Sequence, residues 1–347
     1  MRVILEEGGP RLRRSPPPRP REDPAVLVDI ELAALCRSDL KEVAGSRHGP
    51  SQFGHELVGI VRESTVPALA EGTRVVLDPN VVVDRGTGFA DHMWAAGPAD
   101  LLRQALQPVP HGPAARRLVF AEPIACAQHC LGAVQRQVGD LRGVHVMVLG
   151  AGTAGLLIAA LAGRAGARVS VHNRSRARMD EARKAGLLDV PWLLFGEPAA
   201  GRADVVVVAT SFVLPAGLDE ALRLVAPGGL VLLYGGTAPG DRYPGLDCDL
   251  DHVRRTGTVA ACTWRGHSLR VAGSYGTTPQ DFAAAIGDLT DVAAPLRAEA
   301  LVAGEVDLPG LLGLLRTPDA LGPGKIVVHP EPPDGTPMTA AAPPCSR

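Results

Sequence analysis

The sequence predicts an α/β protein with a β-rich region at the start of the chain and a doubly wound parallel sheet after it. In the N-terminal third, apolar-rich and partly alternating segments are separated by turns marked by Gly and Pro. From residue 120 onward, apolar strands alternate with helical segments, a pattern typical of a parallel sheet covered by helices on both faces. A chain of 347 residues is long enough for two such domains.

Composition excludes several classes of protein. Lys and Arg total 35 against 37 Asp and Glu, so bulk charge does not favour nucleic-acid binding. Six cysteines in a chain of this length are not a disulfide framework, and we expect no signal peptide and a cytoplasmic location. Val146–Gly163 is 18 residues without a charge, but its glycines favour a buried strand, turn and helix over a membrane segment.

The elements expected before residue 120 are strands joined by turns. A Pro/Arg-rich loop is expected from Pro10 to Pro24. The four strands predicted by apolar, partly alternating residues are Met1–Leu5, Ala25–Ala34, Glu56–Glu63 and Arg74–Leu77.

The elements expected after residue 120 alternate in type. Strands are predicted at 145–149, 168–171, 204–209 and 230–234, and helices at 125–134, 154–163, 176–185 and 218–225. A strand at 271–273, helices at 279–289 and 308–315, and a strand at 325–329 close the fold. The Pro/Ala-rich tail, 331–347, is expected to be disordered.

A phosphate-binding loop is predicted where the strand at 145–149 meets the next helix. The residues Gly150, Gly152, Thr153, Ala154 and Gly155 lie in a G-x-G-x-x-G pattern. The first glycine permits the tight turn, the second lets the backbone approach a pyrophosphate, and the third lets the helix pack on the strand. This context favours a Rossmann-type dinucleotide site over a Gly-rich turn without a ligand.

The next strand suggests which dinucleotide binds. An NAD site needs an acidic residue here for the ribose 2′-hydroxyl, but the strand leads into Asn173, Arg174, Ser175 and Arg176. An amide, a hydroxyl and two guanidinium groups suit a 2′-phosphate, which favours NADP(H) over NAD(H). The alternative is that the arginines are solvated charges in an Arg-rich sequence.

Cys36 and His55 are candidate zinc ligands. Both residue types bind zinc, and Asp39 is placed to orient the imidazole through its other nitrogen. The pair alone leaves metal binding and core packing equally open, because a catalytic zinc needs a third protein ligand.

Three segments together resemble a known family. They are Cys36-Arg37-Ser38-Asp39, Gly54-His55-Glu56 and Ala121-Glu122-Pro123, followed by the dinucleotide loop. This combination is similar to the zinc-dependent medium-chain dehydrogenase/reductase family, and the resemblance extends to about His329. It implies a GroES-like β-rich catalytic domain made from residues 1–118 and 268–330, with a Rossmann domain, 119–267, inserted between them.

The resemblance also implies roles for single residues. Cys36 and His55 match two ligands of the catalytic zinc. Glu122 lies where alcohol dehydrogenases carry a further cysteine ligand. Glu56 matches a residue that supports the site or alternates as a ligand. Either carboxylate is therefore a candidate for the third zinc ligand.

Three further residues with implied roles lie in the Cys36-Arg37-Ser38-Asp39 motif or just after it. Arg37 resembles the arginine that contacts the cofactor pyrophosphate, and Ser38 the hydroxyl that relays the substrate proton. Lys41 occupies the next relay position, where relatives usually carry histidine.

The sequence departs from the family in one segment. Relatives with a structural zinc carry four cysteines in a lobe after the strand at 74–77, and the segment from Asp78 to Phe89 has none, so we expect one zinc per chain. Cys126, His129 and Cys130 lie one helical turn apart, but core packing is favoured over a second metal.

The resemblance implies hydride transfer between NADP(H) and a secondary alcohol or ketone. Glu122 in the Glu-Pro motif favours a polyol, sugar or cyclitol. The alternatives are a zinc-free quinone or enoyl reductase and a non-catalytic NADPH-binding protein.

A homodimer is also expected, because the resemblance implies that the Rossmann sheets of two chains pair edge to edge. The candidate strands for that edge are Leu230–Tyr234 and Thr256–Ala261.

Overall fold

The computed structural model describes residues 1–20, 24–46, 51–318, 321 and 324–331. By internal contacts the chain forms two compact units, Met1–Glu122 with Phe282–Arg347, and Pro123–Asp281. Both junctions lie later in the chain than the boundaries expected after residues 118 and 267. The tail expected at 331–347 lies outside the described residues apart from Glu331.

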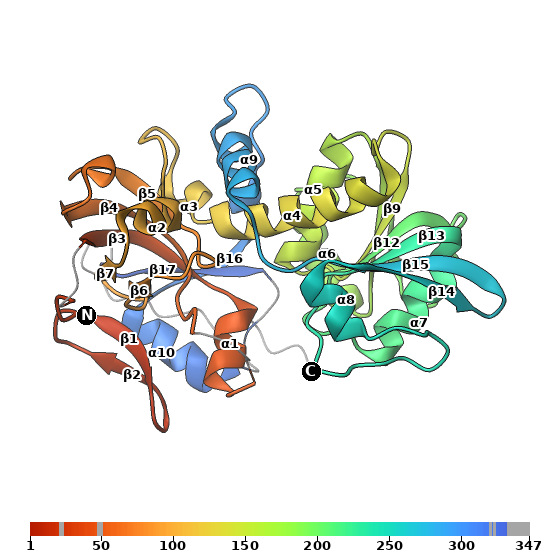
Figure 1. Cartoon of the computed structure of the whole chain (residues 1–347), viewed down its shortest axis with the longest axis horizontal. Helices are drawn as coiled ribbons and strands as arrows, with labels where there is room; N and C mark the ends of the chain where they lie inside the picture. Colours follow the sequence, from red (N-terminus) through yellow and green to blue (C-terminus); the bar gives the residue numbers. More distant parts are fainter. Residues whose placement is uncertain (21–23, 47–50, 319–320, 322–323, 332–347) are drawn as a thin grey trace. The chain divides into compact units, whose positions relative to one another are not determined.

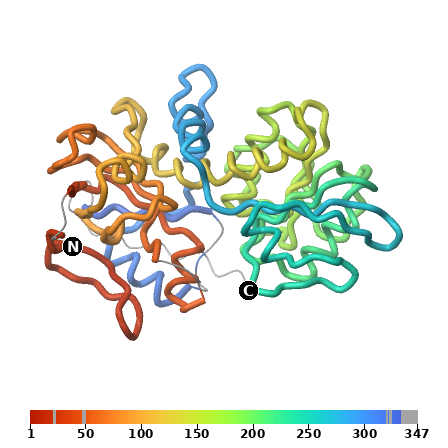
Figure 2. Tube along the Cα trace, viewed as in Figure 1, coloured from red at the N-terminus to blue at the C-terminus, as the bar shows by residue number. Residues whose placement is uncertain are grey.

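The first unit is built on an eight-stranded sheet among the described residues, with strand order β16-β17-β3-β4-β5-β8 and with β7 pairing β3 and β6. The strands are β3 (Ala25–Leu35), β4 (Glu56–Ser64), β5 (Arg74–Leu77), β6 (Asp84–Arg85), β7 (His92–Ala96), β8 (Leu106–Pro108), β16 (Val302–Asp307) and β17 (Lys325–His329). β17 pairs antiparallel with β3, so the two ends of the chain share one sheet, as the red and blue segments of Figure 2 show.

A separate hairpin of β1 (Arg2–Glu6) and β2 (Gly9–Arg13) corrects one expectation. Residues 10–13 were expected to start a Pro/Arg-rich loop, but they form a strand. Glu7 and Gly8 form the tight turn, and Gly8 and Gly9 have positive φ of +90° and +107° there. Arg13 then hydrogen-bonds across the hairpin to the Glu6 carboxylate, with Nε 3.0 Å from Oε1.

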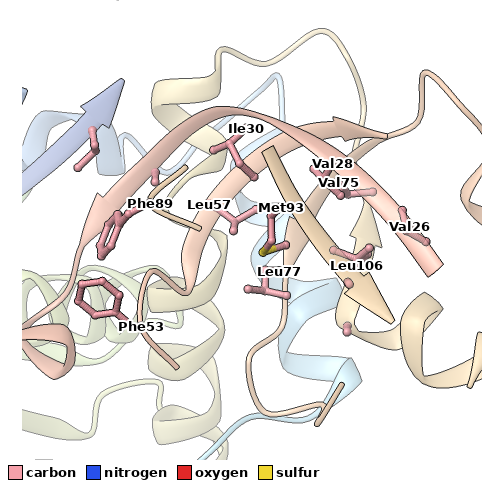
Figure 3. Close-up of a cluster of buried hydrophobic side chains, with 14 of the residues drawn as sticks. Val26, Val28, Ile30, Phe53, Leu57, Val75, Leu77, Phe89, Met93 and Leu106 are labelled. Atoms are coloured by element: carbon pink, nitrogen blue, oxygen red, sulfur yellow. The ribbon is translucent and has the colours of Figure 1, made fainter. Parts of the chain in front are cut away.

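The core of the first unit lies against this sheet. Buried side chains from β3, β4, β5 and β7 meet there, and the Phe53 and Phe89 rings lie edge to face with centroids 5.0 Å apart (Figure 3). The helices of this unit are α1 (Arg37–Val43), α2 (Ala99–Ala105), α3 (Ala115–Leu118) and α10 (Leu308–Arg316). The core fixes the backbone on which the candidate ligands lie.

The second unit contains a seven-stranded sheet with order β11-β10-β9-β12-β13-β15-β14. All neighbouring strands are parallel except β14 and β15. The strands are β9 (His145–Leu149), β10 (Arg168–Asn173), β11 (Trp192–Leu194), β12 (Ala203–Val208), β13 (Val225–Leu233), β14 (Val259–Trp264) and β15 (His267–Gly273). The strand order reverses between β9 and β12, where an open α/β sheet binds its ligand.

Helices cover the sheet on both sides, with α5 on one face and α7 and α8 on the other (Figure 1). The helices of this unit are α4 (Ala121–Val138), α5 (Thr153–Arg164), α6 (Arg176–Lys184), α7 (Pro215–Leu224) and α8 (Leu250–Thr256). The helix α9 (Pro279–Thr290) crosses the second junction, and most of it belongs to the first unit. The predicted doubly wound α/β architecture is therefore confirmed.

Two expectations about the sheet edge need correction. β13, which contains most of Leu230–Tyr234, lies between β12 and β15 and is not an edge strand. The strand expected from Thr256 begins at Val259, because Thr256 ends α8 and Gly257, with φ of +65°, stops the helix. The edge strand on this side of the sheet is β14.

None of the helices in the described ranges has both the length and the apolar character needed to cross a membrane. The uncharged stretch Val146–Gly163 divides into β9, the glycine loop and α5.

Candidate metal centre and dinucleotide loop

Three potential metal ligands lie together in the described part of the first unit. Cys36 follows β3, His55 precedes β4, and Glu56 is the first residue of β4. One ligand atom from each lies within 4.8 Å of the others, and His55 and Glu56 are buried. A thiol, an imidazole and a carboxylate are donors that zinc accepts in catalytic sites, so these residues fit the ion.

The Asp39 carboxylate joins the two segments that carry the cysteine and the histidine. Its Oδ2 accepts a hydrogen bond from Cys36 N at 2.8 Å, and its Oδ1 accepts one from Gly54 N at 2.9 Å. Gly54 has φ of +65°, and a Cβ there would lie 2.7 Å from Phe89 N. Only glycine fits this position, and Asp39 is fully buried. The spacing of Cys36 and His55 is thus fixed by hydrogen bonds from both backbone segments to the Asp39 carboxylate.

The surroundings of His55 select which ring nitrogen faces the cluster. Nδ1 lies 2.9 Å from Gln52 O and 3.5 Å from Asp39 Oδ1, so Nδ1–H donates on that side and Nε2 is left for a metal. Burial opposes a charge on His55, but its interactions with Asp39 and Cys36 outweigh burial and raise the pKa of His55 well above its usual value. The site therefore stabilises a positive charge.

Lys325 contacts Glu56 at the same centre. Its Nζ donates to Oε1 at 2.7 Å and to Oε2 at 2.6 Å, and both side chains are buried. Burial opposes the lysine charge, but the electrostatic interactions with Glu56, Cys36 and Glu122 outweigh burial and raise the pKa of Lys325. The sequence did not predict this partner. One signal was available, because the chain has 32 arginines but only three lysines, so a lysine at a buried strand end is unusual.

The other residues expected at the centre lie nearby in the first unit. Glu122 is half-buried in the first turn of α4 and outside the three-residue cluster, although its charge acts on Lys325. Ser38 Oγ lies 3.4 Å from His55 Nε2. Arg37 and Ser38 open α1, and Lys41 lies one turn further along that helix.

The glycine loop of the second unit has the geometry its pattern predicts. Gly150 has φ of +121°, and a Cβ there would lie 2.7 Å from Ala209 O. A Cβ on Gly155 would lie 2.0 Å from Gly150 O, so the loop and α5 pack closely. Gly152 precedes Thr153 and Ala154, the first residues of α5, and has no atom within 4 Å of its Cβ position. Gly152 therefore leaves room for a ligand at the helix N-terminus.

The end of β10 presents a polar group beside this loop. Asn173 accepts a hydrogen bond from Ala151 N at 3.4 Å and donates one to Ser175 O at 3.0 Å. Ser175 caps α6, and Arg176 forms an ion pair with Glu197 at 3.3 Å. Arg174 is exposed and makes no hydrogen bond or ion pair with another described residue. Arg174 is therefore the more available cation.

Cys126, His129 and Cys130 of α4 lie within the second unit. His129 Nδ1 lies 2.8 Å from Asp281 Oδ2, and Cys130 is buried with its pKa raised by burial. Cys126, His129 and Cys130 do not form a metal-binding group within the described ranges.

The fold and the two sites define a class of protein that combines a metal-suited β-rich unit with a dinucleotide-type α/β unit. Residues 22–105 match the model of the alcohol dehydrogenase GroES-like domain. The chain is 26% identical over 211 residues, 53% of its length, to an uncharacterized zinc-type alcohol dehydrogenase-like protein of Haemophilus influenzae. It is 25% identical over 207 residues, 50% of its length, to (R,R)-butanediol dehydrogenase of Neisseria gonorrhoeae. These matches span 59% and 57% of the two relatives.

Solved structures share the whole fold. Galactitol-1-phosphate dehydrogenase from Escherichia coli aligns with a TM-score of 0.71 at 20% identity, covering 95% of this chain and 99% of that one. 2R,3R-butanediol dehydrogenase from Bacillus subtilis aligns with a TM-score of 0.69 at 19% identity, covering 94% and 98%. These matches support the zinc-dependent medium-chain dehydrogenase/reductase family that the motifs predict.

Proposed function

We propose that the protein is a zinc-dependent oxidoreductase that transfers a hydride between NADP(H) and a secondary alcohol or ketone. The observation that carries this proposal is the grouping of Cys36, His55 and Glu56 within 4.8 Å, in a chain that also has a complete dinucleotide loop. The named relatives act on butanediol and galactitol 1-phosphate, which supports a polyol, sugar or cyclitol substrate.

Cys36 and His55 would hold the zinc, together with one carboxylate. Glu56 lies in the cluster, but both its oxygens bind Lys325, so one of them must leave the lysine before it can bind a metal. This pairing favours Glu122 as the third ligand and Glu56 as the residue that neutralises Lys325. Glu122→Gln should then weaken zinc binding more than Glu56→Gln, which a chelator competition measures.

When bound, zinc would act as a Lewis acid toward the substrate oxygen, and the nicotinamide would exchange the hydride. Ser38 is proposed to take the proton of the substrate hydroxyl, since its own hydroxyl lies beside His55 Nε2. Lys41 is the next candidate along α1 for that proton path. Arg37 is proposed to bind the cofactor pyrophosphate.

The preference for NADP(H) rests on the residues after β10. The β10 end offers an amide and an exposed guanidinium where NAD enzymes carry a carboxylate. The 2′-phosphate would bind Arg174 first, because Arg176 already has a carboxylate partner.

We also propose a homodimer that covers β14. This strand ends the sheet and leaves one row of backbone groups without a strand partner among the described residues. A second copy paired along β14 would satisfy those groups. Light scattering tests this proposal: a dimer mass supports it, and a monomer or tetramer mass contradicts it.

NADPH oxidation against a panel of ketones, with metal-free and zinc-reloaded protein, tests the activity. Turnover should require zinc, and Ser38→Thr should retain much more activity than Ser38→Ala because it keeps the hydroxyl. Turnover that survives complete metal removal would instead support a zinc-free reductase of the same family.

A further inference from the structure

Two arginines and a tyrosine form a cluster at the carboxyl ends of β13 and β15 in the second unit. Arg254 and Arg255 lie on α8, and their guanidinium carbons are 5.0 and 5.5 Å from the centre of the Tyr275 ring. Tyr275 lies two residues after the end of β15. A Cβ on Gly273 would lie 2.1 Å from Arg254 Cα, so α8 packs directly on the end of this strand. The positions of both arginines are therefore fixed by the sheet.

The positive charges of this cluster are not neutralised by an ion pair. Arg254 Nε donates to Tyr234 O at 3.2 Å, and its other nitrogens make no hydrogen bond with a described residue. Neither arginine forms a salt bridge within the described ranges. Asp251 lies one turn earlier on α8 but is buried and accepts a hydrogen bond from Thr237 Oγ1 at 2.7 Å.

Holding the two charges together costs electrostatic free energy. Burial lowers the pKa of Arg254, and the charge of Arg255 lowers it further against the opposing effects of Tyr275, Tyr234 and Asp251. An anion bound beside both guanidinium groups would offset this repulsion and would accept hydrogen bonds from N–H groups that have no partner among the described residues.

We propose that Arg254 and Arg255 form a binding site for a phosphate group. Guanidinium groups bind phosphate with paired N–H donors, and the Tyr275 ring limits their orientations. The cluster also lies at the carboxyl edge of the sheet, where open α/β folds bind their ligands. The phosphate belongs either to the substrate, as a phosphate ester, or to the dinucleotide. The substrate source rests on the proposed function, whereas the anion site itself does not.

Binding of inorganic phosphate to the full-length protein, followed by ³¹P line broadening, tests this site. Arg255→Gln is the main variant, because Arg255 is exposed and its loss should leave the fold intact. We expect it to weaken phosphate binding by about tenfold or more, with Arg254→Gln acting in the same direction. Arg265→Gln is the matched control, because Arg265 also stacks on an aromatic ring, 4.4 Å from the Trp264 centroid, and no second described arginine lies over that ring.

Repeating the titration with NADPH bound distinguishes the two sources. If the Arg255-dependent phosphate binding persists, the substrate supplies the phosphate. If NADPH abolishes the phosphate binding, and Arg255→Gln weakens NADPH binding by the same factor as phosphate binding, the dinucleotide supplies the phosphate. Equal phosphate affinity in wild type and Arg255→Gln would overturn the site. Protein that holds no zinc and turns over no ketone, yet shows Arg255-dependent phosphate binding, would refute the proposed function and leave this site standing.

Discussion

Lys325 Nζ lies 2.7 and 2.6 Å from the two carboxylate oxygens of Glu56, the residue that follows the candidate ligand His55. The contact joins positions 269 residues apart and is buried on both sides. It ties the last strand of the chain to the metal centre, and it keeps a negative charge inside the first unit.

Removing the lysine should be costly. Lys325→Met leaves the Glu56 carboxylate buried without its partner, which costs about 3–5 kcal/mol of unfolding free energy. The double variant Glu56→Gln, Lys325→Met should lose much less than the sum of the single losses. Urea denaturation measures these values, with Lys184→Met, at an exposed lysine, as the control. Additive losses would show that the two side chains do not depend on each other.

Two glycines of the dinucleotide loop should respond differently to the same substitution. Gly155→Ala should destabilise the second unit, because its Cβ would lie 2.0 Å from Gly150 O. Gly152→Ala should fold normally, because no atom lies within 4 Å of its Cβ position, and yet weaken NADP(H) by blocking the pyrophosphate. Thermal unfolding and cofactor titration separate the effects. Full cofactor affinity in Gly152→Ala would mean that no pyrophosphate approaches this loop.

Arg174 and Arg176 should contribute unequally to cofactor choice. Arg174→Ala should weaken NADP(H) binding by roughly tenfold while leaving NAD(H) nearly unchanged, because only NADP(H) has the phosphate that it would bind. Arg176→Ala should have the smaller effect, since Arg176 is already paired with Glu197. The measurement is a titration of both variants with both cofactors, and an equal loss for NAD(H) would contradict the assignment.

His172 should make stability sensitive to acid. The ring is fully buried, neither nitrogen has a hydrogen-bond partner among the described residues, and Glu220 Oε1 is 3.8 Å away. Burial lowers the pKa of His172. In the unfolded chain the pKa of His172 is about 6.5, so as pH falls the unfolded chain binds the proton before the folded protein does. The contribution of His172 to the free energy of unfolding is therefore fully present above about pH 6.5, and it is lost as pH falls toward the lower pKa of the folded state.

The loss from His172 amounts to at most about 1.4 kcal/mol per pH unit. His172→Leu should reduce the loss of stability between about pH 7 and about pH 5. Part of the loss should remain, because burial also lowers the pKa of His145. Exposed His252 gives the control variant His252→Gln. Denaturation curves at several pH values decide, and an unchanged slope in His172→Leu would show that this ring does not titrate with unfolding.

Local patterns in the sequence predicted most of the helices and strands. The strands at 74–77, 145–149 and 325–329 begin and end where their apolar runs predict. The glycine loop was also predictable, because its tight turn and the start of its helix lie within six consecutive residues. The structure brings Cys36 and His55 together, and their role as zinc ligands stays a prediction.

The features that sequence reasoning missed depend on contacts between distant residues. Nothing near Lys325 indicates that it binds Glu56, because β17 reaches the site only by pairing with β3. The interior place of β13 depends in the same way on β15, which inserts beside it after a hairpin. β2 was missed because a Pro/Arg-rich segment has little apolar periodicity, although its backbone is extended.

The metal content of the purified, active protein tests the central claim most directly. One zinc per chain is expected in the wild type. Cys36→Ser should lose that zinc while remaining folded, since a catalytic zinc orders little of the chain, whereas Cys126→Ser should keep it. No zinc in active wild-type protein, two zincs per chain, or full zinc in Cys36→Ser would contradict the account.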